Sequence, residues 1–485
     1  MNFSEYLNNY LIENNLSSAQ AAKKIGIDRT IFYRYTTGKR TPQSEEQVEE
    51  IANRLYMSAK EKEELIEKYD RAVLGDEIVS SFHYVNRLMK TLSNADTFNC
   101  QKSFSFLEGS GNKYRGVPEK SSYIASPQAI VECAYLICQG EKASDRKSSI
   151  RMIMQPTYNT IENMLTPLFS ELETEIEQII CLEKTIEKSY INLDIIENLI
   201  TPAFCLNNFR VYYHYDILKS HLSTASLLPN MILSDNCALL FDYEMQNGYI
   251  TQDKEMIIYL KKQFDLLKSK CSSFIENDSY ANIVQENSMV IEAARIETLF
   301  NQPCIVPCLG RKLLDKYIVN FPMKKQLIDT LIATHGDWDG MKHRPPESYA
   351  ACYCTEEGIL EIFKTGRIAE FPEKFYLPFT KEGKIAILDR MLYLHKNNLH
   401  NYVIFKSGAN LPDTIQIYCN PKHHTVTLRY TSDDHLMQIN IAEISLYNSI
   451  MHYLEYINKK GLSKSLQETT DLLNNIREKL INDSF

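Results

Sequence analysis

Long apolar runs are absent from this sequence of 485 residues, although hydrophobic residues make up 44% of it and charged residues 24%. No segment approaches the roughly 20 apolar residues that span a bilayer. The N-terminal residues MNFSEYLNNY form neither a basic leader nor an apolar signal segment. The composition is that of an ordinary globular protein, and we expect a cytoplasmic protein with no membrane partner.

Sequence motifs of catalysis are missing as well. The chain contains no G-x-S-x-G, no H-E-x-x-H and no glycine-rich turn between a strand and a helix. The segment GSGNK has neither the length nor the lysine-serine ending of a phosphate loop, and it is expected to form a turn. We therefore expect no catalytic residues, no cofactor and no enzyme activity.

Metal and disulfide patterns are weak. No two of the twelve cysteines form a C-x-x-C pair. Cys304 and Cys308, in PCIVPCL, come closest, but buried reduced thiols are the expected state. His335 and His343 bound HGDWDGMKH, which holds two carboxylates and the single tryptophan. Their order matches no metal motif, and the glycines predict a surface loop, so we expect no metal site.

Residues 16–42 form the clearest pattern that is present. Ser17 and Gln20 have the spacing of a capping box that opens a helix. Gly26 is suited to end this helix, because glycine adopts the left-handed conformation without a Cβ penalty. Asp28 is a good N-cap for a following helix. The stretch predicts a helix, a tight turn, a second helix and a basic loop.

The second helix separates into a buried side and an exposed side. Phe32, rather than Ile31, is expected in the core together with Tyr35, at a spacing of three. Arginines at the start of an exposed helix suit guanine edges or phosphates in a DNA major groove. The residues left facing outward are Arg29, Thr30, Tyr33 and Arg34.

Positive charge is concentrated in the same part of the chain. Residues 1–42 carry a balance of +3, whereas the whole chain carries −9, so that the remainder carries −12. Lys39 and Arg40 follow Gly38 in a turn where contact with the DNA backbone is expected. A basic patch on an acidic protein can bind DNA while the body is repelled, which orients the molecule.

The stretch resembles the XRE family of Cro-like and lambda-repressor-like helix-turn-helix domains. Leu16-Ser17, Gly26-Ile27 and Gly38-Lys39-Arg40 stand at matching places, and the resemblance covers roughly residues 3–70. Ser18 stands where the family often has glutamine, Asp28 replaces a common serine, and Tyr33 is bulkier than usual. The DNA contacts indicated by the resemblance and the basic loop are Ser18, Arg29, Thr30, Ile31, Tyr33, Arg34, Lys39 and Arg40.

The resemblance implies a five-helix lambda-repressor-like DNA-binding domain. The whole chain is also similar to long XRE-type regulators of Firmicutes. We predict a mostly α protein with α+β parts, in which this domain is followed by a helical region and two small α+β lobes. The predicted boundaries are residues 1–74 for the domain, 76–204 for the helical region, 205–300 for the first lobe and 301–485 for the second.

A weak internal repeat underlies the two lobes. One copy begins at Leu228 and the other at Leu411, and each opens with Leu-Pro. Each then has three short strand-like stretches and an amphipathic helix, with longer turns in the second copy. Two interpretations remain open, because a duplication and two unrelated β-β-β-α units predict the same pattern.

The predicted function is sequence-specific DNA binding by a transcriptional regulator, such as a repressor. Heads of the XRE type usually bind as homodimers to near-palindromic double-stranded DNA, since one helix contacts too few base pairs. The body would supply dimerisation and a site for a small-molecule or peptide effector. Two alternatives remain: an enzyme targeted to DNA by its head, and an interaction hub in a phage or mobile-element system that represses its own promoter.

Overall fold

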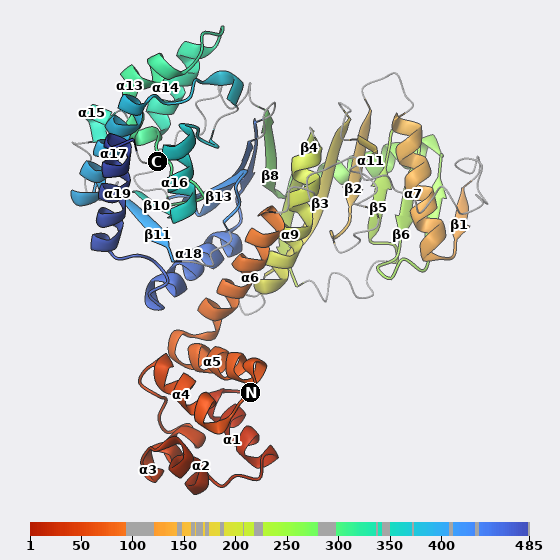
Figure 1. Ribbon diagram of the computed structural model, residues 1–485. Helices are drawn as coiled ribbons and strands as arrows, with labels where there is room; N and C mark the ends of the chain where they lie inside the picture. Colours follow the sequence, from red (N-terminus) through yellow and green to blue (C-terminus); the bar gives the residue numbers. More distant parts are fainter. Residues whose placement is uncertain are drawn as a thin grey trace. The chain divides into compact units, whose positions relative to one another are not determined.

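The computed structural model describes most of the chain. The described residues are 1–93, 121–142, 148–156, 161, 168–169, 174–184, 189–206, 208–217, 227–279, 297–335, 338–341, 350–370, 373–406, 411–431 and 436–483. They are mostly helical and include one large mixed sheet (Figure 1). The turn predicted at GSGNK lies outside them. None of the described helices combines the length and the apolar composition needed to cross a membrane.

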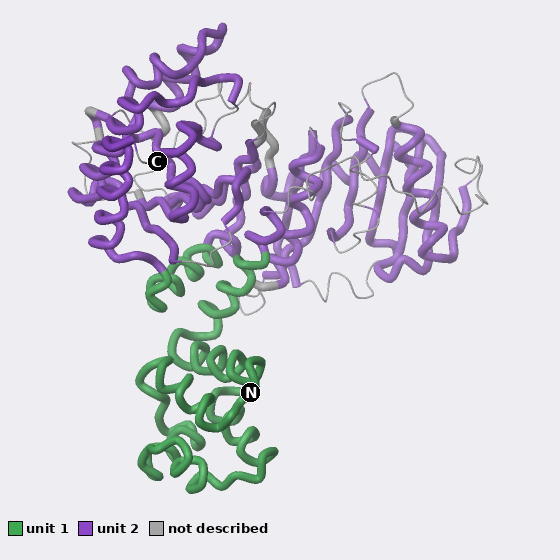
Figure 2. Tube along the Cα trace, viewed as in Figure 1, with its two compact units in different colours: residues 1–87, 448–462 green, residues 88–447, 463–485 purple. Residues whose placement is uncertain are grey.

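The chain divides into two compact units, which Figure 2 shows in different colours. The first unit consists of residues 1–87 and 448–462, and the second of residues 88–447 and 463–485. The first unit therefore combines the start of the chain with a short segment from near its end.

Five helices at the start of the first unit share one apolar core, which includes Leu7, Phe32, Ile51 and Leu65. Their ends follow from local capping, since Ser17 and Ser58 both form capping boxes. The helices are α1 (Phe3–Glu13), α2 (Ser18–Ile25), α3 (Arg29–Thr36), α4 (Glu45–Leu55) and α5 (Ala59–Leu74).

Two further helices contribute to the first unit through residues 76–87 and 448–459. These are α6 (Asp76–Ser93) and α18 (Ile444–Lys459). They meet through aromatic side chains, because the Phe82 ring stacks on Tyr456 with 3.9 Å between the ring centroids. Ile78 and Val79 of α6 belong to the same small apolar cluster.

A buried carboxylate fixes the end of α5 to the segment after α18. Asp70 is 3% exposed. The Nζ atom of Lys460 lies 2.8 and 3.0 Å from its two carboxylate oxygens, and the Tyr456 hydroxyl donates to one of them at 2.8 Å. Lys460 also donates to Glu45 at the start of α4. Three parts of the chain, up to 415 residues apart, therefore meet at one ion-pair cluster.

The predicted N-terminal domain, residues 1–74, is consequently too short. The compact unit continues to residue 87 and includes residues 448–462, which the sequence analysis placed in the second lobe. The partners of Asp70 are almost 400 residues away, so no local pattern could indicate them.

Fourteen described strands form one mixed sheet in the second unit. Their order is β1-β7-β6-β5-β2-β3-β4-β8-β14-β13-β12-β9-β10-β11. The strands are β1 (Ser122–Ile124), β2 (Ser149–Ile153), β3 (Glu175–Glu183), β4 (Phe209–Asp216), β5 (Asn230–Leu233), β6 (Ala238–Phe241), β7 (Gly248–Thr251), β8 (Ser272–Ser279), β9 (Glu297–Leu299), β10 (Ala350–Thr355), β11 (His400–Phe405), β12 (Ile415–Asn420), β13 (Thr425–Thr431) and β14 (Leu436–Ile441).

The same seven-strand topology occurs twice in this sheet. In the first repeat β2, β3 and β4 are parallel, β5, β6 and β7 form an antiparallel meander beside β2, and β1 pairs with β7. In the second repeat β9, β10 and β11 are parallel, β12, β13 and β14 form the meander beside β9, and β8 pairs with β14. The antiparallel pair β4–β8 joins the two repeats.

A helix closes each meander, and further helices belong to the second unit. The helix α11 follows β7, and α18 follows β14. The described helices outside the first unit are α7 (Pro127–Lys142), α9 (Ser189–Cys205), α11 (Lys254–Lys268), α13 (Val306–Tyr317), α14 (Lys324–His335), α15 (Trp338–Met341), α16 (Glu356–Thr365), the 3-10 helix η4 (Glu373–Phe375), α17 (Lys381–Lys396) and α19 (Leu466–Ile481).

The repeats are larger than the predicted lobes. The first described element of the first repeat is β1, and the second repeat begins with β8, so the predicted boundary near residue 300 is wrong. The correspondence covers seven strands and a helix, whereas the sequence pattern covered three strands and a helix. This topology favours a duplication over two unrelated β-β-β-α units.

The prediction that residues 76–204 are helical is also wrong in part. Strands β2 and β3 lie in this region, and residues 176–183 of β3 are buried. Ile176, Ile179 and Ile180 have a spacing of three and four, which resembles one face of a helix. A parallel strand buried on both faces has a nearly continuous apolar sequence, so the period of two that identifies a strand is lost.

The Lys460→Ala variant tests the ion-pair cluster. Removing the ammonium leaves the Asp70 carboxylate buried without its cation, and we expect a loss of about 3–5 kcal/mol from the free energy of unfolding in urea. The neighbouring variant Lys459→Ala is the control, because Lys459 pairs with Glu455 on an exposed helix face. It should cost at most about 0.5 kcal/mol. Equal losses in the two variants would contradict the account.

The same cluster has a pH signature. Burial alone would lower the pKa of Lys460, but its hydrogen bonds to Asp70 and Glu45 outweigh burial and raise the pKa. A lysine whose pKa is higher in the folded state stabilises the protein below the ordinary lysine pKa of about 10.4 and loses this effect as pH rises further. Alkaline destabilisation should therefore be steeper in the wild type than in Lys460→Ala.

Helix α16 requires a glycine at position 358, because the backbone of Asn301 lies against it. A Cβ atom on Gly358 would lie 2.0 Å from the backbone oxygen of Asn301, whereas nothing lies within 4 Å of a Cβ on Gly140 in α7. We expect Gly358→Ala to destabilise the protein by about 1–3 kcal/mol or more through overpacking. Gly140→Ala should instead stabilise it by about 0.5–1 kcal/mol. Thermal unfolding followed by circular dichroism should show a lower melting temperature for Gly358→Ala and a higher one for Gly140→Ala than for the wild type.

Candidate nucleic-acid interface

The turn between α2 and α3 has the local structure that the sequence indicates. Ser17 and Gln20 form the capping box, with the Ser17 backbone N–H donating to Gln20 Oε1 at 2.9 Å. Gly26 ends α2 with φ of +84°, in the left-handed region where glycine is favoured. Asp28 then caps α3 by accepting from the N–H groups of Thr30 at 2.8 Å and Ile31 at 3.1 Å.

The negative charge of the Asp28 carboxylate lies at the N-terminus of α3, where it is electrostatically favourable. The N–H groups of Ile31 and Thr30 hold its pKa below the ordinary value. It therefore stays ionised at neutral pH and favours the positive end of the α3 dipole. Asp28 therefore caps the helix and also places a negative charge beside the candidate surface.

Helix α3 has one buried side and one exposed side, as predicted. Phe32 is fully buried and Tyr35 is 5% exposed, whereas Tyr33 on the other side is 53% exposed. At 100° per residue the exposed side chains span an arc of about 140°. The residues of this arc are Arg29, Thr30, Tyr33 and Arg34, all exposed. The arc is less than half of the helix circumference, so all four side chains can face one ligand surface.

Ile31 and Ser18 are less available than the other predicted contacts. Ile31 is half-buried and packs against the core of the first unit. The hydroxyl oxygen of Ser18 is buried and has no hydrogen-bond partner among the described residues. A phosphate contact from Ser18 would therefore require its side chain to rotate outward.

The basic loop follows α3 directly. The Thr37 hydroxyl donates to the Tyr33 carbonyl at 2.8 Å, and the Arg40 backbone N–H donates to the Arg34 carbonyl at 3.2 Å. Gly38 takes φ of +72°. Lys39 is exposed and Arg40 is half-buried. These bonds hold the loop against the end of α3, so the two cations lie next to the exposed arc in the chain.

Most cations of α4 and α5 have a carboxylate partner, which the cations of residues 1–42 lack among the described residues. On α4 and α5, Arg54, Lys62 and Arg71 each have a carboxylate within 4.0 Å. The cations of residues 1–42 have no ion pair with any residue that the structure describes. They are Lys23, Lys24, Arg29, Arg34, Lys39 and Arg40. Their charges are thus free to interact with an external anion.

Tyr56 is a residue that the sequence analysis did not select. It is 81% exposed, and its φ of +63° is rare for a residue with a side chain. The ammonium group of Lys24 lies 5.2 Å from the centre of its ring. No sequence pattern distinguishes this tyrosine from others in the chain. Its exposure beside a cation that has no ion pair among the described residues makes it a further candidate contact.

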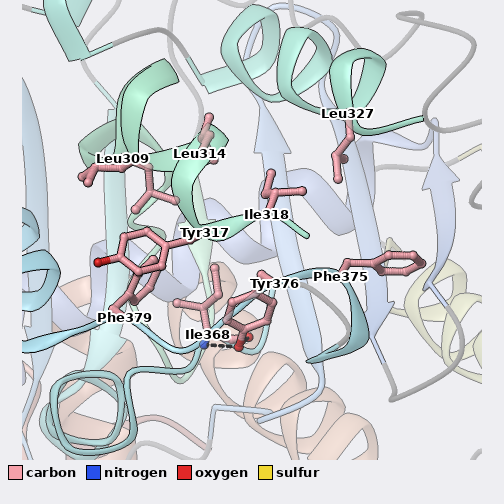
Figure 3. Close-up of a pocket in the computed structure, with 10 residues that line it drawn as sticks. Leu309, Leu314, Tyr317, Ile318, Leu327, Ile368, Phe375, Tyr376 and Phe379 are labelled. Atoms are coloured by element: carbon pink, nitrogen blue, oxygen red, sulfur yellow. Dashed lines mark hydrogen bonds between the residues drawn. The ribbon is translucent and has the colours of Figure 1, made fainter. Parts of the chain in front are cut away.

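An apolar pocket lies in the second unit (Figure 3). Its cavity volume is about 20 Å³, room for about one water molecule and far below the 300–1,000 Å³ of ligand sites. The Tyr376 hydroxyl is engaged by the backbone of Ile368, at 2.6 and 2.9 Å. The lining includes Leu309, Leu314, Tyr317, Ile318, Tyr376 and Phe379. In this form the pocket is too small for an effector.

A buried group of titratable side chains lies near the three parallel strands of the second repeat. The neighbouring Cys354 and His400 side chains lower the pKa of Cys352, whereas burial raises the pKa of Glu370 to about 7. All four side chains are at most 3% exposed. Burial therefore keeps substrates away from this group, although its members converge as those of an enzyme site would.

The two weaker sequence candidates lie in the second unit, and the second of them is only partly described. Cys304 and Cys308 are buried and form no disulfide, and the Cys308 sulfur lies 3.2 Å from the Tyr402 hydroxyl. The surface loop predicted at residues 335–343 is partly helical, because His335 ends α14 and Trp338–Met341 form α15. His343 lies outside the described residues. Within those residues, no three histidine, cysteine or acidic side chains gather as a metal ion would require.

Comparison with known proteins gives no family. No protein-family model and no curated protein matches the chain. Several solved structures are similar to it in part, and three of them are described below. TrmBL2, described as an archaeal chromatin protein with a novel mode of DNA binding, is 8% identical with a TM-score of 0.22, over 44% of this chain and 70% of its own.

The other two are enzymes. Polyphosphate kinase from Porphyromonas gingivalis is 12% identical with a TM-score of 0.23, over 72% of this chain and 52% of its own. Phosphatidylserine synthase from Haemophilus influenzae Rd KW20 is 8% identical with a TM-score of 0.23, over 75% of this chain and 92% of its own. Similarity this low supports no assignment, so the function has to follow from the geometry of the chain itself.

Proposed function

We propose that the protein is a transcriptional regulator that binds double-stranded DNA through α3 and acts in the cytoplasm. The observation that carries this proposal is the exposed arc of α3, together with the surrounding cations that have no carboxylate partner among the described residues. An exposed cation without a carboxylate partner interacts with any polyanion that approaches. Here such cations gather around one capped helix whose opposite side is fixed in a core.

In the proposed complex, α1 to α5 act as a lambda-repressor-like domain and α3 lies in the major groove. The guanidinium groups of Arg29 and Arg34 suit guanine edges or nearby phosphates, and Thr30 suits a thymine methyl group. Lys39 and Arg40 contact phosphates and fix the position of the helix without selecting a sequence. Ile31 is half-buried, so only the exposed part of its side chain can contact the DNA.

We further propose that the protein binds as a homodimer. One helix of two turns contacts too few base pairs for useful specificity, so two heads on a near-palindromic site are required. The body would then dimerise and respond to a small molecule or a peptide. The response would be a shift between two populations that differ in the spacing of the heads.

The recognition helix is tested by Arg29→Ala and Arg34→Ala in the full chain. Removing an arginine that binds a base should weaken binding to the protein's own upstream DNA by about 1–3 kcal/mol, and removing one that binds a phosphate should reduce the salt slope by about one. Arg54→Ala is the matched control, since Arg54 is an exposed arginine of the same unit that pairs with Glu50. It should leave both quantities unchanged. Unchanged affinity and slope in the α3 variants would refute the assignment.

The dimer on DNA is tested by footprinting of the upstream region. Two protected half-sites should appear with centres one helical turn apart, about 34 Å or 10 base pairs, or a multiple of this spacing. Their sequences should be related by an inverted repeat. A single protected half-site at saturation would contradict the proposed dimer.

A further inference from the structure

The helix α11 of the first repeat has apolar side chains on both of its sides. Its inner side packs in a core cluster of the sheet through Ile257, Leu260 and Phe264. On its outer side Ile258, Tyr259 and Leu266 are 54%, 56% and 54% exposed. Helix α11 therefore has three large apolar side chains that are more than half exposed.

The outer side chains of α11 share one face. At 100° per residue, Ile258, Tyr259 and Leu266 fall within an arc of about 100°. Glu255 and Lys262 fall within the same arc, between the apolar side chains. A stripe of this kind, apolar with one acid and one base, is a surface that another helix can cover.

The second repeat shows what such a face binds. The helices α11 and α18 begin three residues after the meander strands that precede them, so adding 190 to a residue number in α11 gives its counterpart in α18. Leu266 then corresponds to Tyr456, which stacks on Phe82 of α6. Lys262 corresponds to His452, whose Nδ1 lies 3.4 Å from the Ser81 hydroxyl of α6. In the second repeat α6 therefore covers the part of the equivalent face that holds His452 and Tyr456, whereas Asn448, the counterpart of Ile258, is exposed.

The two charges of the α11 stripe lack partners within the described chain. Lys261 pairs with Asp235 and Lys268 with Glu177, whereas Glu255 and Lys262 make no ion pair with any described residue. Glu255 and Lys262 are seven residues apart, about 10.5 Å along the helix, which is too far for an ion pair with each other. Both are exposed and are therefore available to a partner outside their own helix.

A second copy of α11 supplies both partners. In an antiparallel pair with its two-fold axis between Ile258 and Tyr259, each Ile258 opposes Tyr259 of the second copy. The same symmetry places Glu255 opposite Lys262, twice. We propose that α11 forms this antiparallel pair in a homodimer of the chain, which deepens the proposed function by locating its dimer interface. A two-fold pair also has the symmetry of a near-palindromic DNA site.

The test is a charge exchange, with dimerisation of the full chain measured by sedimentation equilibrium without DNA. Glu255→Lys and Lys262→Glu each place like charges opposite one another and should weaken the dimer at least tenfold. The double variant Glu255→Lys with Lys262→Glu should restore the dissociation constant to within about threefold of the wild type. Restoration requires contact between two copies, because the positions are too far apart within one helix.

The apolar centre is tested in the same experiment. Ile258→Asp should abolish the dimer, and Leu466→Asp is the matched control, because Leu466 on α19 is also 54% exposed. The control should dimerise like the wild type. A monomeric wild type, a dimer insensitive to all α11 variants, or a double variant as weak as the single ones would overturn the proposal.

This outcome is independent of DNA recognition. A monomeric Ile258→Asp variant should bind a DNA half-site with the same affinity as a wild-type head, since α3 is unchanged. Conversely, Arg29→Ala should leave the dimer unchanged. The proposed dimer interface and the proposed DNA-binding function can thus be refuted independently of each other.

Discussion

The buried carboxylate of Asp70 is the interaction on which the organisation of the chain depends. An unpaired carboxylate in a protein core is strongly unfavourable. The burial of Asp70 is therefore stable only with the ion pair to Lys460 and the hydrogen bond from Tyr456. Through this cluster, the helices that carry the candidate DNA surface are held to the segment that follows α18. The N-terminal unit is therefore not an independent head on a linker, because part of it comes from the end of the second repeat.

Two continuous helices connect the two compact units, and the proposed effector response could pass along them. The boundary between the two compact units falls inside α6 and inside α18. Helix α18 starts directly after the last strand of the sheet, and Lys460 of the Asp70 cluster follows its last residue. A helix transmits a displacement along its length more readily than a flexible loop does. The two repeats thus offer two related helices, of which α18 contributes to the first unit and α11 has an exposed outer face.

The sequence predicts local structure where the controlling interactions are local. Ser17 and Gly26 determine the ends of α2 through bonds to residues a few positions away, and the exposed side of α3 follows from its period. The strand β3 could not be recognised, since Ile176 and Ile180 in a doubly buried strand imitate a helical spacing. The attachment of Lys460 to the first unit leaves no local signal at all. Whether the cations of the candidate surface have carboxylate partners likewise depends on the position of every acid in the fold.

The central claim is that this chain recognises a DNA sequence. The most direct measurement compares the affinity of the full chain for its own upstream DNA and for a scrambled duplex of equal length and composition, at one physiological salt concentration. Specific recognition predicts binding to the upstream DNA at least about 10³-fold tighter than to the scrambled duplex. Equal affinity for the two duplexes would show that the cations around α3 attract DNA without reading it, and would contradict the account.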